Sequence, residues 1–167
     1  MPVLLNVGWL DPRKNQLRLF DAFSQLLRMG RPARLLLVGS SASAATHYRA
    51  PRARWRRSHA TWSCALDLSD AELDYCFRHA RALIYPSLAE GFGLSLVEAL
   101  SRGLPAFVSD IPPFRELADD FAVFFDPQDP SAMAQLLDGF LRTGRCDVSA
   151  PARRVPLADL GSKPSPT

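Results

Sequence analysis

The chain has 167 residues, 47% of them hydrophobic, which is enough for the core of one domain and excludes wholesale disorder. No apolar run approaches the roughly 18–20 residues that span a bilayer, no signal peptide is recognisable, and the three scattered cysteines and three scattered histidines predict neither disulfides nor a metal site. The net charge of +3 divides unevenly, because residues 1–60 hold eleven Lys/Arg against two Asp/Glu whereas residues 61–167 hold nine against fifteen.

Strands and helices alternate along the first part of the chain. A short apolar run at 3–7 that ends in Gly8 predicts a buried strand. Apolar residues at three-and-four spacing over 17–27 predict an amphipathic helix, and residues 35–38 predict a second buried strand that ends in Gly39. Residues 40–62 are the least readable, and we expect a loop with a short helix there.

The alternation continues to about residue 142. Ser69 and Glu72 form a capping box that opens a helix running to about residue 79. The remaining helices are expected at 95–101, 112–117 and 131–141, and the remaining strands at 82–85, 106–109 and 122–125. The tail over 143–167 is rich in proline and little periodic, so we expect it to be mostly disordered.

Continuous apolar strands joined by helical crossovers predict a parallel sheet that is covered on both faces. The fold class is therefore α/β, a Rossmann-like, doubly wound sheet formed by residues 1–142. Such sheets bind ligands outside the carboxyl ends of their strands. The loops that follow the strands at 3–7, 35–38, 82–85 and 106–109 are thus the places to look for a site.

The segment that follows Tyr85 carries the most specific signal. Gly91 and Gly93 let the backbone turn sharply and approach a ligand, and the free N–H groups of the helix that follows suit a phosphate. Glu90 precedes this helix, and Glu98 lies inside it among apolar residues, where a carboxylate needs partners. A sugar diol is one such partner, since one carboxylate can accept two hydroxyl hydrogens. The alternatives are turn chemistry for the glycines and a structural cap or ion pair for Glu98.

Glu90 and Glu98, with seven residues between them and Gly-Phe-Gly-Leu inside, resemble the paired-glutamate signature of the fourth glycosyltransferase family. The resemblance covers about residues 3–142 and is nearest to bacterial mannosyl- and rhamnosyl-type transferases of surface polysaccharides. Further motifs in the family's order are Asp11–Asn15, Leu68–Leu73, Ser109–Pro112 and Phe125–Pro127.

The resemblance implies a GT-B fold, in which two Rossmann-like domains face each other across a cleft and the C-terminal one holds the sugar nucleotide. This chain resembles that one half alone. The implied reaction is a retaining transfer of a hexose from a nucleoside diphosphate sugar to a glycan or lipid-linked acceptor, with no metal or other cofactor. The chain would be inactive without an N-terminal acceptor domain or subunit, and the expected place is the cytoplasm or the inner face of the membrane.

The resemblance also implies roles for individual residues. Glu90 would face the donor sugar and Lys14 would bind the diphosphate, which makes these two the catalytic candidates, while Glu98 would hold the ribose hydroxyls. The remaining donor-binding candidates are Gly8, Gly39 and Leu66 near the base, and Gly91, Phe92, Gly93 and Leu94 in the glycine loop. Lys14 has independent support, because it follows the first strand and is the only lysine before Lys163 in a chain with eighteen arginines.

The chain departs from the family at Trp9, where an arginine usually shares the diphosphate; Arg13 could reach the phosphate instead. Trp9 and the missing acceptor half favour one alternative, a non-catalytic sugar-nucleotide or phosphate-binding module, or an inactive fragment. The arginine run at 49–57 raises a nucleic-acid-binding reading, but it has few interleaved aromatic residues, so we expect no nucleic-acid partner. That run could equally face solvent or an anionic lipid surface.

Overall fold

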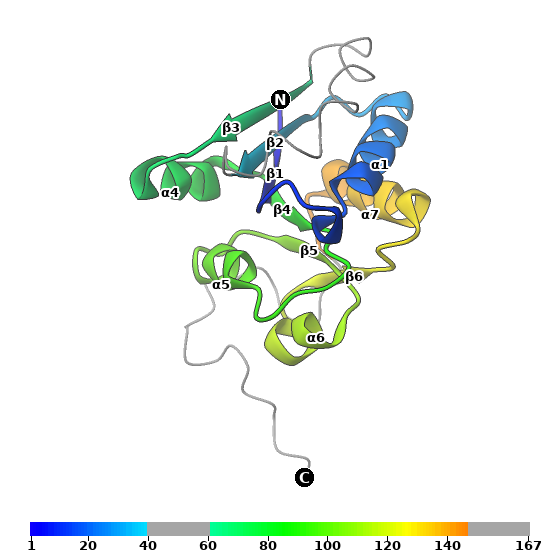
Figure 1. Ribbon diagram of the computed structural model, residues 1–167. Helices are drawn as coiled ribbons and strands as arrows, with labels where there is room; N and C mark the ends of the chain where they lie inside the picture. Colours follow the sequence, from blue (N-terminus) through cyan, green and yellow to red (C-terminus); the bar gives the residue numbers. More distant parts are fainter. Residues whose placement is uncertain (40–60, 147–167) are drawn as a thin grey trace.

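A computed structural model describes residues 1–39 and 61–146 (Figure 1). The described residues form one six-stranded sheet in the order β3-β2-β1-β4-β5-β6, with every neighbouring pair parallel. The strands are β1 (Val3–Val7), β2 (Arg34–Gly39), β3 (Trp62–Leu66), β4 (Ala82–Tyr85), β5 (Ala106–Ser109) and β6 (Val123–Phe125). The helices are the 3-10 turn η1 (Pro12–Lys14), α1 (Gln16–Arg28), α4 (Asp70–His79), α5 (Leu94–Ser101), α6 (Pro112–Ala118) and α7 (Pro130–Thr143).

Two hydrophobic clusters cover the two faces of the sheet. Neighbouring residues of β1 divide between them, because successive side chains of a strand point to opposite faces. Leu4 packs with the apolar faces of α1 and α7, which lie side by side in Figure 1. Leu5 packs in the second cluster with residues of α4, α5 and α6. The predicted class, a doubly wound α/β sheet, is therefore confirmed.

Strand β3 was not predicted, and this part of the interpretation was wrong. It pairs with β2 from Leu35↔Trp62 to Gly39↔Leu66 and has no second neighbour in the described sheet. Its side chains are half-buried or exposed, so an edge strand of this kind does not need the continuous apolar run that marks the central strands. The short helix expected in the same stretch falls mostly on residues 40–60, outside the described residues.

Helix α7 runs to Thr143 and ends at Gly144, which has a φ of 68°. Residues 143–146 of the predicted disordered tail are thus described, whereas residues 147–167 and the arginine run at 49–57 lie outside the described residues. None of the helices that the structure describes is both long and apolar enough to cross a bilayer.

The topology favours one crevice at the sheet edge for ligand binding. From β1 the chain moves outward through β2 to β3, and from β4 it moves the other way through β5 to β6. Strands β1 and β4 are neighbours in the sheet, so the loops that follow them separate at the point where the winding reverses. In open parallel sheets this switch point, at the carboxyl ends of the strands, is where ligands bind.

Candidate functional site

Two loops form the walls of this crevice, the loop after β1 and the loop after β4. Hydrogen bonds join them: Asn15 Nδ2 donates to the Pro86 carbonyl at 3.0 Å, and the Leu88 amide donates to the Arg13 carbonyl at 2.7 Å. Asn15 is buried and has a φ of 57°, a left-handed conformation that asparagine adopts more readily than most residues. Lys14 lies between Arg13 and Asn15 in the chain, so these contacts hold it opposite the loop after β4.

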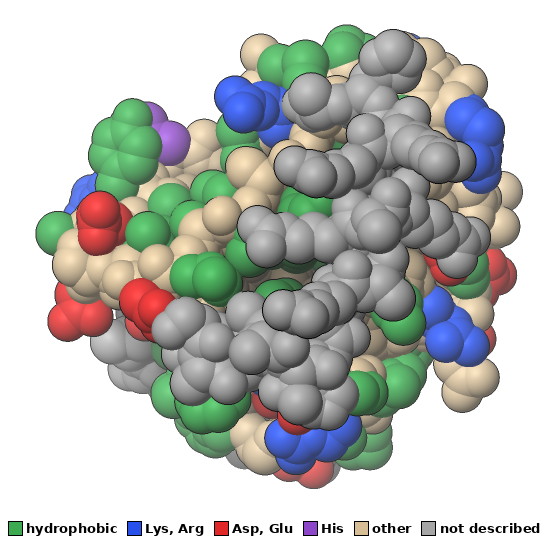
Figure 2. All heavy atoms as spheres, turned by 45° about the horizontal axis from the view of Figure 1, so that its top comes forward, with side chains coloured by type: hydrophobic (Ala, Val, Ile, Leu, Met, Phe, Trp, Pro, Cys, Tyr) green, Lys and Arg blue, Asp and Glu red, His purple; other side chains and the backbone are tan. Residues whose placement is uncertain are grey.

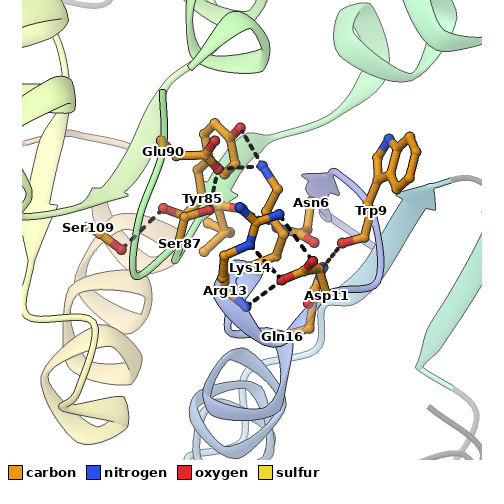
Figure 3. Close-up of polar contacts among 11 residues, drawn as sticks. Asn6, Trp9, Asp11, Arg13, Lys14, Gln16, Tyr85, Ser87, Glu90 and Ser109 are labelled. Carbon is orange, nitrogen blue, oxygen red and sulfur yellow. Dashed lines mark hydrogen bonds and ion pairs between the residues drawn. The ribbon is translucent and has the colours of Figure 1, made fainter. Parts of the chain in front are cut away.

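Lys14 and Glu90 lie at the centre of the site (Figure 3). Lys14 Nζ is 2.5 Å from Glu90 Oε1 and also donates to the Tyr85 hydroxyl at 3.3 Å. Ser87 Oγ donates to the same Glu90 oxygen at 2.6 Å. The Lys14 and Glu90 side chains are only 18% and 11% exposed, so solvent screens this pair less than a surface pair. An ammonium has three hydrogens, which leaves Lys14 one donor for a ligand.

Tyr85 connects this pair to α5. Burial raises the pKa of its hydroxyl above the usual value, and the negative charges of Glu90 and Glu98 raise it further, while a hydrogen bond with Ser95 opposes the shift. The phenol therefore stays protonated at neutral pH. Glu90 and Glu98 therefore both lie within electrostatic range of this one hydroxyl.

The start of α5 presents free backbone donors. No acceptor among the described residues is found for the amides of Phe92, Gly93, Leu94 and Ser95. The first turn of a helix carries a partial positive charge, and its unpaired N–H groups bind anions. The glycine loop thus offers four amides at the same edge of the sheet as the Lys14 ammonium.

Gly93 is required by the backbone at this turn. Its φ is 89°, and a Cβ placed on it would lie 2.9 Å from Cε1 of Phe114 in α6. Phe114 is fully buried and has no room to move. The glycine loop is therefore held against α6, which fixes the direction in which the free amides point.

The Glu98 side chain is available to a ligand. It is the fifth residue of α5, and no hydrogen bond or ion pair reaches its carboxylate from residues 1–39 or 61–146. Arg102 donates instead to the Glu98 backbone carbonyl at 2.8 Å. The alternative of a structural ion pair thus has no support in the described chain.

The three residues expected near a nucleobase lie together at the ends of β1, β2 and β3. The Gly8 amide donates to the Val38 carbonyl at 2.9 Å. A Cβ on Gly39 would lie 2.8 Å from the Gly8 carbonyl oxygen and 4.0 Å from Cδ2 of Leu66, which is 37% exposed. Two glycine backbones in contact beside an exposed leucine form the shelf of Gly8, Gly39 and Leu66, where no side chain of the two glycines stands in the way.

Two positions near Lys14 do not supply a further cation. The Arg13 guanidinium donates to both oxygens of Asp11, at 3.1 and 3.2 Å, which raises the pKa of Arg13 and neutralises its charge. Trp9 is 61% exposed, and its ring points away from Lys14 and Glu90 (Figure 3). The idea that Arg13 replaces the family's arginine is therefore not supported by its contacts.

Charges of both signs are mixed on the described surface. On the face shown in Figure 2, the coloured Lys and Arg side chains lie in small groups among Asp and Glu. Within the described ranges no three His, Cys, Asp or Glu side chains come close enough to hold a metal ion. That the reaction needs no metal stays a prediction.

Sequence reasoning missed three residues that build the site. Asn15 joins the two loops, and Tyr85 and Ser87 bind the Lys14–Glu90 pair. All three are buried and carry polar groups; Tyr85 and Ser87 lie at a predicted strand end, and Asn15 lies just before a predicted helix. A polar residue in such a place needs a partner, and this is the signal that could have found them.

The matched family model, described as glycosyl transferases group 1, covers residues 1–153. The chain belongs to this family. Two curated relatives from Escherichia coli are similar over most of it. The serotype-specific mannosyltransferase WbdA is 31% identical over 140 residues, which are 84% of this chain and 17% of that protein. The O-antigen chain mannosyltransferase B is 34% identical over 137 residues, 78% of this chain and 34% of that protein.

Among solved structures, the sucrose-phosphate synthase of Thermosynechococcus elongatus has a TM-score of 0.73 and 25% sequence identity. The match covers 85% of this chain and 36% of that one. This family member thus spans between about a sixth and about a third of the length of these similar proteins. Its described domain has the Rossmann-like fold found in GT-B glycosyltransferases.

Proposed function

We propose that this chain is the donor-binding half of a retaining glycosyltransferase. It transfers a hexose from a nucleoside diphosphate sugar to a glycan or lipid-linked acceptor in surface polysaccharide synthesis. A separate acceptor domain or subunit forms the other wall of the cleft, in the cytoplasm or at the inner face of the membrane. The names of the two Escherichia coli relatives support a hexose donor and a polysaccharide product.

One observation carries this proposal. At the β1–β4 switch point, an ammonium (Lys14), four free amides and two carboxylates (Glu90 and Glu98) share one edge of the sheet. The ammonium and the amides suit a diphosphate. The carboxylates suit the sugar and ribose hydroxyl groups on either side of it. A sugar–diphosphate–ribose ligand presents these groups in the same order.

Each part of the ligand then has a place. The base lies on the shelf of Gly8, Gly39 and Leu66, and Glu98 accepts hydrogen bonds from the ribose hydroxyls. The diphosphate lies between Lys14 and the start of α5. The donor sugar lies against Glu90, which already accepts from Lys14 and Ser87 and, as a carboxylate with about four acceptor positions, can still accept a sugar hydroxyl.

The chemistry follows from this placement. The bond between the anomeric carbon and the diphosphate oxygen breaks, and that oxygen keeps the electron pair. A new bond forms from the acceptor oxygen to the anomeric carbon, and the acceptor hydroxyl passes its proton to the departing diphosphate. Lys14 and the α5 amides stabilise the charge that grows on the diphosphate. Glu90 binds and orients the sugar and is not a nucleophile; retention of configuration is carried over from the family.

A melting-temperature screen of the 167-residue chain tests the proposal. The ligands are the diphosphates of uridine, guanosine, adenosine and thymidine, each with and without a sugar. A ligand that binds only the folded chain must raise the melting temperature, by an amount that grows with its concentration. The proposal expects one base to stabilise the chain and its monophosphate to do so less. No shift with any of these diphosphates would contradict it.

A non-catalytic sugar-nucleotide-binding module is the second candidate, and Trp9 in place of a phosphate-binding arginine is the observation that favours it. The two candidates differ in one experiment. The chain is combined with the acceptor domain of the Escherichia coli O-antigen chain mannosyltransferase B and assayed for sugar transfer. Turnover supports the enzyme half, whereas donor binding without turnover supports the module.

A further inference from the structure

A pocket of about 200 Å³ lies beside the glycine loop, and Phe92 is the one lining residue whose backbone amide the proposed function also uses for the nucleotide. It is lined by Gly91, Phe92, Pro113, Glu116 and Leu117, so one wall is the loop after β4 and the other is α6. Gly91 directly follows Glu90 in the chain. A ligand here would therefore be a close neighbour of the proposed donor sugar.

Phe92 gives the pocket an aromatic wall. Its side chain is 61% exposed, which is unusual for a large apolar residue on a fixed backbone. The turn that carries it is held in place by Gly93 against Phe114. Leu117, only 8% exposed, extends the apolar surface. An exposed aromatic ring with an apolar floor is suited to a ligand that has a flat apolar face.

Glu116 gives the pocket a polar group without a partner. No described residue forms an ion pair or side-chain hydrogen bond with it. Its neighbour Arg115 is occupied by Asp110 and Asp119, each at 2.7 Å. The lining thus holds one carboxylate and no cation, so it disfavours phosphate and favours a neutral ligand with paired hydroxyl groups.

A sugar ring has both properties, an apolar face and a diol edge. The volume agrees, because it is below the roughly 300–1,000 Å³ of pockets for drug-sized ligands and suits a single small ring. We propose that this pocket is a second carbohydrate subsite, in which one neutral sugar ring of the acceptor or product chain packs on Phe92 and hydrogen bonds to Glu116. The inference rests on the proposed function, since it places an acceptor sugar beside the donor site.

The test is an amide NMR titration of the 167-residue chain with methyl α-mannoside, while a nucleoside diphosphate occupies the nucleotide position and leaves the donor-sugar position open. We expect saturable shifts at the amides of Gly91, Glu116 and Leu117. Phe92→Ala, which keeps the backbone amide, and Glu116→Gln should each weaken the apparent affinity about tenfold, the loss of one stacking contact or charge-assisted hydrogen bond. The matched controls are Tyr75→Ala, an aromatic residue on α4 with 62% exposure, and Asp120→Asn; neither should change the affinity.

Three outcomes would overturn the subsite. The first is no shift at these amides up to about 100 mM sugar, well beyond weak millimolar binding. The second is an unchanged affinity in both variants, with their folding checked by circular dichroism. The third is a set of shifts confined to Ser87 and Glu90, which would place the sugar in the donor position only. Nucleoside diphosphate binding separates the two proposals: if it persists without sugar binding, only the subsite fails, and if it is absent, the donor site fails.

Discussion

Lys14 is the residue on which the proposed diphosphate contact depends. Its ammonium is held by Glu90 and Tyr85 before any ligand arrives, so it is already oriented towards the crevice. Preorganisation of this kind reduces the cost of binding. It also means that removal of Lys14 leaves a half-buried carboxylate without its cation, which has a separate effect on stability.

Lys14→Ala should therefore weaken the binding of a nucleoside diphosphate much more than the binding of the corresponding nucleoside. The expected loss is about 1.5–3 kcal/mol for the diphosphate, the range of a hydrogen bond to a charged group, and little for the nucleoside. Calorimetric titration of both ligands measures the difference. The double variant Lys14→Met with Glu90→Gln restores stability without the cation, and it should show the same selective loss. Equal losses for the two ligands would argue against a phosphate contact.

Glu98→Gln should weaken the binding of the nucleoside diphosphate by about tenfold or more. The reason is that a neutral amide replaces the carboxylate that accepts hydrogen bonds from the ribose hydroxyls. Since the Glu98 carboxylate has no partner in the described residues, the substitution should leave the unfolding temperature nearly unchanged. Asp120→Asn, at an exposed position on the loop after α6, is the control. An unchanged affinity in Glu98→Gln would remove the ribose role.

At this scale the sequence predicted the edge of the sheet at which the candidate residues lie, but not the contacts that their side chains make. The order of strands and helices places Lys14, Glu90 and Glu98 at one sheet edge, and the structure agrees. Spacing alone cannot tell that Arg13 folds onto Asp11 or that Trp9 points away, since both depend on local side-chain contacts.

Among the elements, the start of α5 depends most on a single residue. Gly93→Ala would place a Cβ 2.9 Å from the Phe114 ring at a φ of 89°. We expect a loss of about 1–3 kcal/mol in the free energy of unfolding from backbone strain, together with weaker diphosphate binding. Urea denaturation measures the first effect.

Gly139→Ala is the matched control, because Gly139 lies within α7 and a Cβ there meets no atom within 4 Å. Alanine is favoured over glycine inside a helix by about 0.5–1 kcal/mol, so this variant should be slightly more stable. If both alanines have the same effect, the constraint on Gly93 is not the one inferred here.

The elements also show where sequence patterns succeed. The capping box of α4 was predicted, and Ser69 and Glu72 make both of its reciprocal contacts. The four-residue strands β4 and β5 are fully buried, so each has a continuous apolar or small-residue run that can be read directly. Strand β3 has one neighbour and few buried side chains, and its pairing with β2 is a long-range contact that a local pattern does not contain.

For the whole molecule, acid stability should depend on ion pairs at the surface. Arg115 holds the pKa of Asp110 below its usual value, and Arg78 and Arg102 do the same for Asp74. A carboxyl whose folded-state pKa is depressed stabilises the fold above its unfolded pKa of about 3.9, and this stabilisation is lost as the pH falls through the folded pKa.

The double variant Asp74→Asn with Asp110→Asn should therefore lose less stability than the parent chain as the pH falls below about 4. Thermal unfolding at pH 3 and pH 6 measures this difference. Asp120→Asn, which forms no ion pair with any described residue, should behave like the parent. A parallel pH dependence in all three proteins would show that these pairs do not contribute.

At the largest scale, the chain matches only a part of each relative, and the proposed reaction needs a second wall for the cleft. The doubly wound parallel class could be inferred from the alternation of elements, because parallel strands with crossovers allow few topologies. The acceptor could not, since the proposed acceptor domain is not part of this sequence. The proposed donor site, by contrast, uses residues of this chain and can be tested alone.

The most direct test is an amide NMR map of the chain bound to the nucleoside diphosphate that raises its melting temperature most. The account predicts that the largest shifts fall at the carboxyl edge of the sheet, at Gly8, Lys14, Gly39, Leu66, Phe92, Gly93, Leu94, Ser95 and Glu98. Shifts at the opposite edge, around Arg81 and Pro105, or no saturable shifts at all, would contradict it.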